Sequence, residues 1–187
     1  MLKLRNSREY YGWVAILLHW SMAVAILALF ALGLWMVKLN YYDAWYNLAP
    51  DIHQGVGMIL LAMLLLRLFW SWSNIKPNIA ASAWETVAAI AAHRLLYLLM
   101  LMVMVSGYLI PTAEGEGFDM FGWLNVPALW HLSSTQAEWA GKIHRWSAWA
   151  MIGLAGLHTT AALKHHLINR DHTLMRMMGI TQKEKQI

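Results

Sequence analysis

Four stretches of the sequence are long and apolar enough to cross a membrane as helices. They run over about residues 12–37, 55–72, 86–110 and 139–163. Roughly 20 apolar residues in helical form span the hydrocarbon core of a bilayer. The chain of 187 residues is 59% hydrophobic and only 13% charged, which lies outside the usual range for soluble domains. We therefore expect an all-α integral membrane protein, folded as a four-helix bundle in a single domain, residues 1–187.

The placement of Lys and Arg predicts the direction of the spans, because cytoplasmic loops carry an excess of these residues. The N-terminus, the loop between the second and third spans and the C-terminal tail share one side. That side holds eleven of the 14 Lys and Arg residues: Lys3, Arg5, Arg8, Arg67, Lys76, Arg94, Lys164, Arg170, Arg176, Lys183 and Lys185. The other side holds Lys38, Lys142 and Arg145. Both termini are thus predicted to face the cytoplasm.

Histidines lie at matched depths in these spans, and an ionisable side chain in hydrocarbon usually marks a functional site. His19 lies near the cytoplasmic end of the first span, and His53 at the outer end of the second. His144 and His158 are 14 residues apart, so they share one face of the fourth span at depths roughly 21 Å apart. These depths pair His19 with His158 near the cytoplasm, and His53 with His144 near the outer surface.

Histidine is an axial ligand of haem iron, so two such pairs could hold two b haems, one near each membrane surface. The sequence has no cysteine, which excludes covalent c-type attachment. A different metal is one alternative, although zinc or copper would need three or four ligands at one depth. Purely structural histidines are the other. Gly55 and Gly57 follow His53 and could leave room for a flat macrocycle, or simply let helices pack closely.

Further polar residues lie near the predicted ligands. Arg67 and Arg94 on the cytoplasmic side, and Arg145 on the outer side, are candidates for pairing with haem propionates. Interfacial snorkelling is the alternative for each of them. His93 lies at the same depth as His158 and competes with it as a ligand. Because only two histidines fit one iron, we expect His93 to contact the site without binding the metal.

A basic cluster ends the fourth span. Lys164, His165 and His166 follow His158 and could hydrogen-bond a quinone near the cytoplasmic-side haem. We favour His165 for this role. The alternative is a cluster that holds the helix end at the interface by attraction to anionic lipid.

Several short motifs follow one another along the chain. They are His19-Trp20, Ile52-His53-Gln54-Gly55, His93-Arg94-Leu95-Leu96-Tyr97, Ser106-Gly107-Tyr108-Leu109, and the C-terminal series of His144, His158, Lys164-His165-His166 and Asp171-His172-Thr173-Leu174-Met175-Arg176-Met177-Met178. Together they resemble the bacterial cytochrome b561 family of diheme membrane cytochromes. The resemblance covers nearly the whole chain.

The resemblance implies a multi-pass protein of the bacterial inner membrane with two b haems, whose ligand positions in the family match His19, His53, His144 and His158. It also implies electron transfer that involves ubiquinone, and one branch of the family passes electrons from superoxide to quinone. We therefore expect electron transfer between a redox partner on the periplasmic side, with superoxide as one candidate, and the ubiquinone pool. Two alternatives stay open: a haem-bearing anchor subunit of a dehydrogenase or periplasmic redox system, and a haem-free structural or transport bundle. Membrane lipid is an expected partner, and nucleic acid is not.

Overall fold

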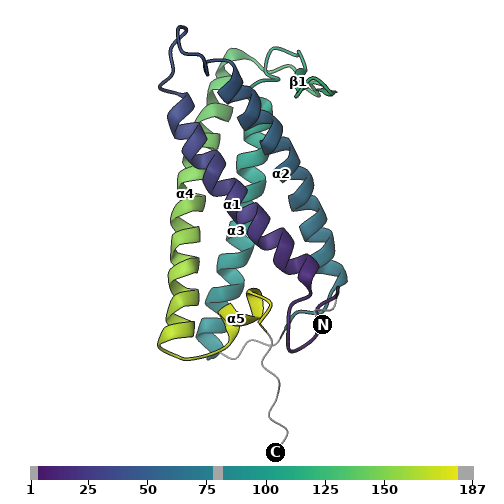
Figure 1. Ribbon diagram of the computed structural model, residues 1–187. Coiled ribbons are helices and arrows are strands. Elements are labelled where there is room, and N and C mark those ends of the chain that lie inside the picture. The colour runs from purple at the N-terminus through teal and green to yellow at the C-terminus, as the bar shows by residue number, and fades with distance from the viewer. Residues whose placement is uncertain (1–3, 78–81, 181–187) are drawn as a thin grey trace, which may run out of the picture.

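The computed structural model describes residues 4–77 and 82–180 and is mostly helical. Its elements in chain order are α1 (Trp13–Met36), α2 (Leu48–Ser73), α3 (Ala83–Leu109), β1 (Phe118–Met120), β2 (Leu124–Val126), α4 (Ser134–Leu167) and α5 (Thr173–Met177). The long helices run side by side along the molecule (Figure 1). Lys3, Lys183 and Lys185, which enter the charge comparison above, lie outside the described residues.

Two helices begin more than a full turn earlier than the hydropathy pattern predicts. α2 begins at Leu48 rather than near Gly55, so His53 lies in the second turn of the helix rather than at its very start. α4 begins at Ser134, where Ser133 and Gln136 form a capping box with each other's backbone N–H groups. Hydropathy detects the apolar part of a helix and misses its polar first turns, which explains both differences.

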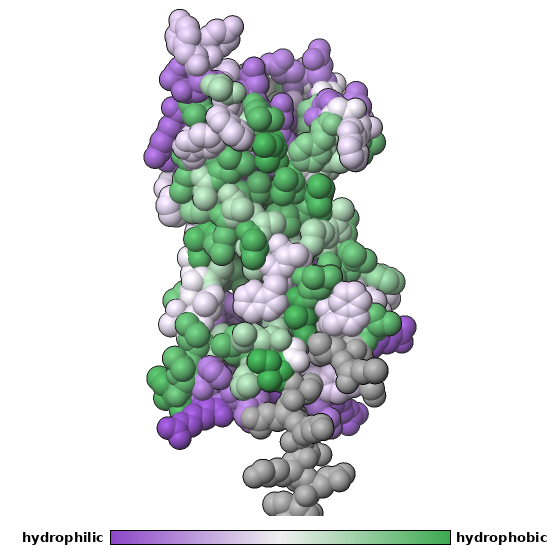
Figure 2. All heavy atoms as spheres, in the orientation of Figure 1, coloured by the Kyte–Doolittle hydropathy of each residue, from purple (hydrophilic) through white to green (hydrophobic). Residues whose placement is uncertain are grey.

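The helices differ in how apolar they are. Among the described residues, α1, α2 and α3 are long and apolar enough to cross a membrane, whereas α4 is not in that group. The fourth predicted span is thus present as one continuous helix. Polar residues within it, such as His144, Arg145 and Thr159, lower its mean hydropathy. Apolar side chains gather around the middle of the molecule, and hydrophilic ones gather at both ends (Figure 2). This is the distribution expected of a protein that lies in a bilayer.

The loops divide between two ends of the molecule. At the first, which we call the terminal end, Asn6 Nδ2 donates a hydrogen bond to the Ile75 carbonyl at 3.0 Å. There too, Trp20 Nε1 donates to the Met177 carbonyl at 2.9 Å, which attaches α5 to α1. The antiparallel pair β1–β2 lies at the opposite end, which we call the hairpin end (Figure 1). The loops assigned to the side rich in Lys and Arg therefore lie at one end of the molecule, and the loops assigned to the other side lie at the opposite end.

The core lies between α1, α2 and α3. Met22, Leu60 and Leu64 are buried there, and Tyr97 and Met104 of α3 pack against them. α4 packs chiefly against α3, while α1 packs against α2 and α2 against α3. The histidine pairs described next join α4 to the helices that it packs against least.

Candidate functional site

The first histidine pair lies toward the hairpin end. The ring centres of His53 on α2 and His144 on α4 are 6.0 Å apart, and the ring planes are inclined by 74°. Nδ1 of His144 lies 2.8 Å from the Val103 carbonyl oxygen, to which it can only donate. The proton is thus on Nδ1, and Nε2 keeps its lone pair. Nδ1 of His53 is buried and has no hydrogen-bond partner in the part of the chain that the structure describes.

The second pair lies toward the terminal end. The ring centres of His19 on α1 and His158 on α4 are 6.5 Å apart, with an interplanar angle of 78°. The His93 ring is 5.0 Å from the His158 ring, and its Nδ1 lies 2.7 Å from the Ala89 carbonyl oxygen. No group of three or more His, Asp or Glu side chains within residues 4–77 and 82–180 is arranged to hold a metal ion directly.

Both separations fit a single metal atom between two imidazoles. A metal–nitrogen bond of about 2 Å on each side, with each nitrogen ~1 Å from its ring centre, places the two ring centres roughly 6 Å apart. The two pairs, at 6.0 and 6.5 Å, are close to this value, whereas the 5.0 Å between His93 and His158 is too short. The residues present therefore fit two haem sites with two histidines each, and the ligand roles of the four histidines remain a prediction.

Two glycines that sequence reasoning did not connect with the histidines lie against their rings. A β-carbon at Gly107 would lie 2.9 Å from Cε1 of His144, and one at Gly33 would lie 3.2 Å from Cε1 of His53. Gly55, predicted to leave room for a macrocycle, instead faces the ring of Phe121 from the β1–β2 turn. Only tertiary structure shows which ring a glycine accommodates, because the contacts cross between helices.

Arg67 is the only one of the three predicted arginines for which a side-chain contact with a predicted ligand is found among the described residues. Its Nη2 atom lies 3.1 Å from Nδ1 of His19, and its Nε atom donates a hydrogen bond to the Tyr97 hydroxyl at 3.0 Å. Arg94 and Arg145 are exposed. The structure therefore brings Arg67 directly to the terminal-end pair.

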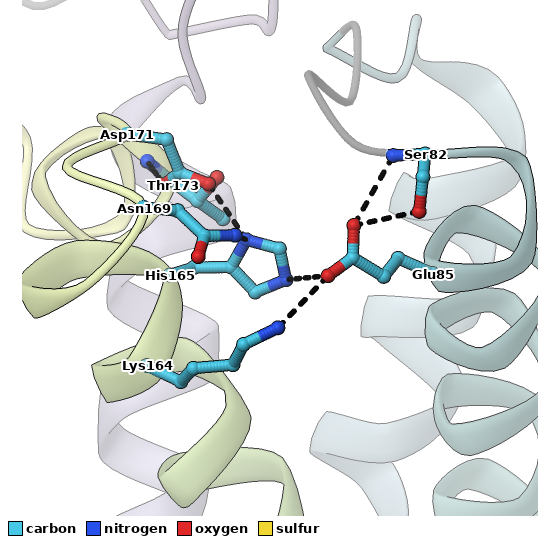
Figure 3. Close-up of polar contacts among 7 residues, drawn as sticks. All are labelled: Ser82, Glu85, Lys164, His165, Asn169, Asp171 and Thr173. Atoms are coloured by element: carbon cyan, nitrogen blue, oxygen red, sulfur yellow. Dashed lines mark hydrogen bonds and ion pairs between the residues drawn. The ribbon is translucent and has the colours of Figure 1, made fainter.

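The basic cluster at the end of α4 contacts carboxylates from other elements (Figure 3). Lys164 Nζ lies 3.0 Å from Oε1 of Glu85 on α3, and His165 Nε2 lies 3.9 Å from the same oxygen. His165 Nδ1 lies 2.8 Å from Oδ2 of Asp171. Ser82 holds the other Glu85 oxygen through its backbone N–H and its hydroxyl. We call Glu85, Lys164, His165 and Asp171 the terminal network.

Two buried nitrogens near the terminal end have no hydrogen-bond partner among the described residues. They are Nδ1 of His166, a member of the predicted quinone cluster, and Nε1 of Trp70, for which no role was predicted. Trp70 is part of an aromatic series at the end of α2 that looks like an ordinary interfacial anchor, so the sequence contains no signal for it. Such unpaired groups are available to a ligand.

Histidine pairs that join α4 to two long apolar helices, α1 and α2, are the arrangement expected of an α-helical membrane protein that holds a metal-bearing cofactor. The family model for prokaryotic cytochrome b561 matches residues 10–179. The chain is 42% identical to cytochrome b561 homolog 2 of Escherichia coli over 180 residues, which cover 95% of this chain and 96% of that protein. It is also 31% identical to cytochrome b562 of Cereibacter sphaeroides (90% and 94% covered) and 26% identical to the probable superoxide oxidase CybB of Yersinia pestis (90% and 95% covered). The chain belongs to the prokaryotic cytochrome b561 family.

Membership of this family establishes the broad properties of the chain. It is a multi-pass protein of the bacterial inner membrane that binds b-type haem and acts in electron transport. The resemblance inferred from the sequence is confirmed. The number of haems, the residues that hold them and the redox partners are proposals, which follow.

Proposed function

We propose that this chain is a diheme cytochrome that carries electrons across the inner membrane between a redox partner on the periplasmic side and the ubiquinone pool. The observation that carries the proposal is the metal-bridging separation of both histidine pairs, 6.0 and 6.5 Å. His19 and His158 hold one haem, and His53 and His144 hold the other. An iron with two histidine ligands has no open coordination position, so it supplies outer-sphere electron transfer rather than oxygen activation.

The helices supply position and insulation for this transfer. α1 to α4 form a four-helix bundle in one domain, and α4 contributes a ligand to each haem. The roughly 21 Å between the depths of His144 and His158 would put two haems bound there near opposite membrane surfaces. The Val103 carbonyl fixes the tautomer of His144, and such a hydrogen bond orients a ligand and raises its basicity.

The arginines complete the haem sites in this proposal. In the structure, Arg67 can only donate to Nδ1 of His19, because guanidinium has no acceptor. An imidazole that binds iron through Nε2 carries its proton on Nδ1 and no longer accepts. With His19 bound in this way, Arg67 would need another acceptor, for which a propionate carboxylate is suited. Arg94 at the terminal end and Arg145 at the hairpin end are exposed and reach propionates only if their side chains fold inward.

The haem content is the first test. We expect two non-covalent b haems per chain in the purified protein, measured by the absorbance of the pyridine complex against protein determined by amino-acid analysis. All of the haem should be extracted by acid–acetone, because the chain has no cysteine. One haem per chain would overturn the diheme proposal.

Orientation is the second element of the proposal. The terminal end faces the cytoplasm, and the hairpin end faces the periplasm, because eleven of the 14 Lys and Arg residues belong to the chain segments assigned to the terminal end. A reporter that is active only in the periplasm should be inactive when fused to the C-terminus and active when inserted in the α3–α4 connection. The reverse pattern would exchange the two membrane sides of both haems.

We place the ubiquinone site at the terminal end, within the cluster of Lys164, His165 and His166. Lys164 and His165 are paired with carboxylates, whereas His166 has a buried nitrogen without a partner, so we expect His166 to make the first contact with a quinone oxygen. This modifies the sequence-based preference for His165. Slow electron exchange with a short-chain ubiquinone in His166→Ala, with both haem spectra retained, is the expected result.

His172→Ala provides the matched control, because His172 is an exposed histidine at the same end. It should exchange electrons at the wild-type rate. Unchanged exchange in both His166→Ala and a triple replacement of Lys164, His165 and His166 would place the quinone elsewhere. The first alternative would be the hairpin end, near Lys142 and Arg145.

The hairpin end supports a second candidate function, that of an anchor subunit for a partner redox protein. In the α3–α4 connection, Trp123 is 93% exposed, and Leu129 and Trp130 are also exposed. Exposed aromatic residues are common at protein interfaces. A partner that co-purifies in mild detergent, and is lost with Trp123→Ser, would favour this function. Direct reduction of the lone protein by superoxide would favour a stand-alone oxidase.

A further inference from the structure

The terminal network joins three separate segments of the chain around one imidazole. Both ring nitrogens of His165 face carboxylates: Nδ1 is 2.8 Å from Asp171 and Nε2 is 3.9 Å from Glu85. Glu85 comes from the first turn of α3, and Asp171 from the connection between α4 and α5. The side chains of Glu85, His165 and Asp171 are only 15%, 19% and 14% exposed, so water screens them less than an ordinary surface pair.

The net charge of this network becomes zero when it binds one proton. Two carboxylates and the ammonium of Lys164 sum to one negative charge when His165 is neutral. A proton on His165 brings the sum to zero. Among the described residues, the other cations that belong to this end are Arg5, Arg8, Arg67, Lys76, Arg94, Arg170, which precedes Asp171, and Arg176 on α5. His165 can accept or release its proton at either ring nitrogen.

The position of the network relates it to the terminal-end haem site. His165 follows His158 by seven residues, which is close to two helical turns, so both side chains lie on the same face of α4, roughly 10 Å apart. Adding an electron to a centre at this distance raises the proton affinity of the network on the order of tenfold at an effective dielectric constant of about 20.

We propose that Glu85, His165 and Asp171 form a redox-linked proton site, which binds one proton from the adjacent aqueous phase when the haem held by His19 and His158 is reduced. The electron would come from the redox partner of the proposed function and would reside on that haem. The proton leaves water or a buffer acid and forms an N–H bond on His165, with the carboxylates as hydrogen-bond acceptors. The proposal rests on the proposed haem ligation, and it holds whether or not ubiquinone binds at this end.

Proton uptake on reduction tests the proposal directly. Purified protein with both haems, in weakly buffered detergent solution with a pH indicator, is reduced electrochemically near neutral pH. The wild type should take up a substantial fraction of one proton per chain. His165→Gln and Glu85→Gln should lose most of this uptake, and the pH dependence of the terminal-end haem potential should flatten with it.

Glu138→Gln is the matched control. Glu138 is also paired with a lysine, Lys142, at 2.7 Å, but it lies at the start of α4, toward the hairpin end. This variant should take up protons as the wild type does. If His165→Gln loses haem, Glu85→Gln and Asp171→Asn test the same site without altering the imidazole. Wild-type protein with both haems but without proton uptake would overturn the proposal, as would undiminished uptake in all three network variants. A wild type without the terminal-end haem would instead refute the proposed function.

Discussion

Gly107 of α3 lies directly against the imidazole of His144 on α4. A β-carbon at this glycine would be 2.9 Å from Cε1 and 3.0 Å from Nδ1 of the histidine, closer than packed atoms normally approach. The same ring nitrogen bonds to the carbonyl of Val103, one helical turn earlier on α3. α3 therefore fixes the position of the His144 ring by both contact and hydrogen bonding, although it contributes no predicted ligand itself.

We predict that Gly107→Ala displaces His144 and weakens the haem site at the hairpin end. Overpacking of this kind costs about 1–3 kcal/mol. The absorbance and redox titration of the purified variant should show a change in one haem only. Gly153→Ala on α4 is the control, because a β-carbon there meets nothing within 4 Å, and alanine favours a helix by up to about 1 kcal/mol over glycine. Equal damage from both substitutions would contradict this role of Gly107.

The histidine pairing predicts how haem is lost in single variants. His53→Ala and His144→Ala should remove the same haem, and His19→Ala and His158→Ala should remove the other, because each iron needs both ligands of its pair. Low-temperature spectra and haem content of the four variants measure this. Loss of the same haem from His53→Ala and His158→Ala, with the other retained, would show that the pairing is wrong.

Arg67→Met should affect the terminal-end pair selectively. It removes the guanidinium that lies beside His19 together with its hydrogen bond to Tyr97, and a hydrogen bond to a charged group contributes about 1.5–3 kcal/mol. We expect a lower thermal midpoint and a shifted potential of one haem. Arg145→Met, which replaces an exposed arginine at the opposite end, should leave that haem unchanged. If both variants behave alike, Arg67 has no specific function at this pair.

We predict that the attachment of α5 depends on pH through the Asp171 carboxyl. Burial alone would raise the pKa of its carboxyl, but hydrogen bonds from Thr173 and His165 outweigh burial and hold the pKa below its ordinary value. The ionised carboxylate therefore stabilises the folded state above the ordinary Asp pKa, and this contribution is lost as pH falls toward the lowered value. Amide exchange at Thr173, whose N–H donates to Asp171 at 2.9 Å, should accelerate relative to α3 amides below about pH 4. In Asp171→Asn this pH dependence should disappear.

The sequence by itself determined the parts of the molecule that depend on local pattern. The apolar stretches predicted α1, α2 and α3, and the spacing of 14 residues placed His144 and His158 on one face of α4. The Lys and Arg count separated the same loops that the structure places at opposite ends. These features follow from helix geometry and from the energetics of charge near a membrane. Both act on short segments of the chain, so they can be predicted without knowing the tertiary contacts.

Only the tertiary structure decided which side chains meet. It brought Gly107 and Gly33 against histidine rings, directed Gly55 to Phe121, and paired Lys164 and His165 with carboxylates that the sequence does not connect with them. It also began α2 and α4 one or more turns earlier than hydropathy indicated. Such contacts depend on the rotation and offset of whole helices against one another, which the sum of many weak packing interactions sets.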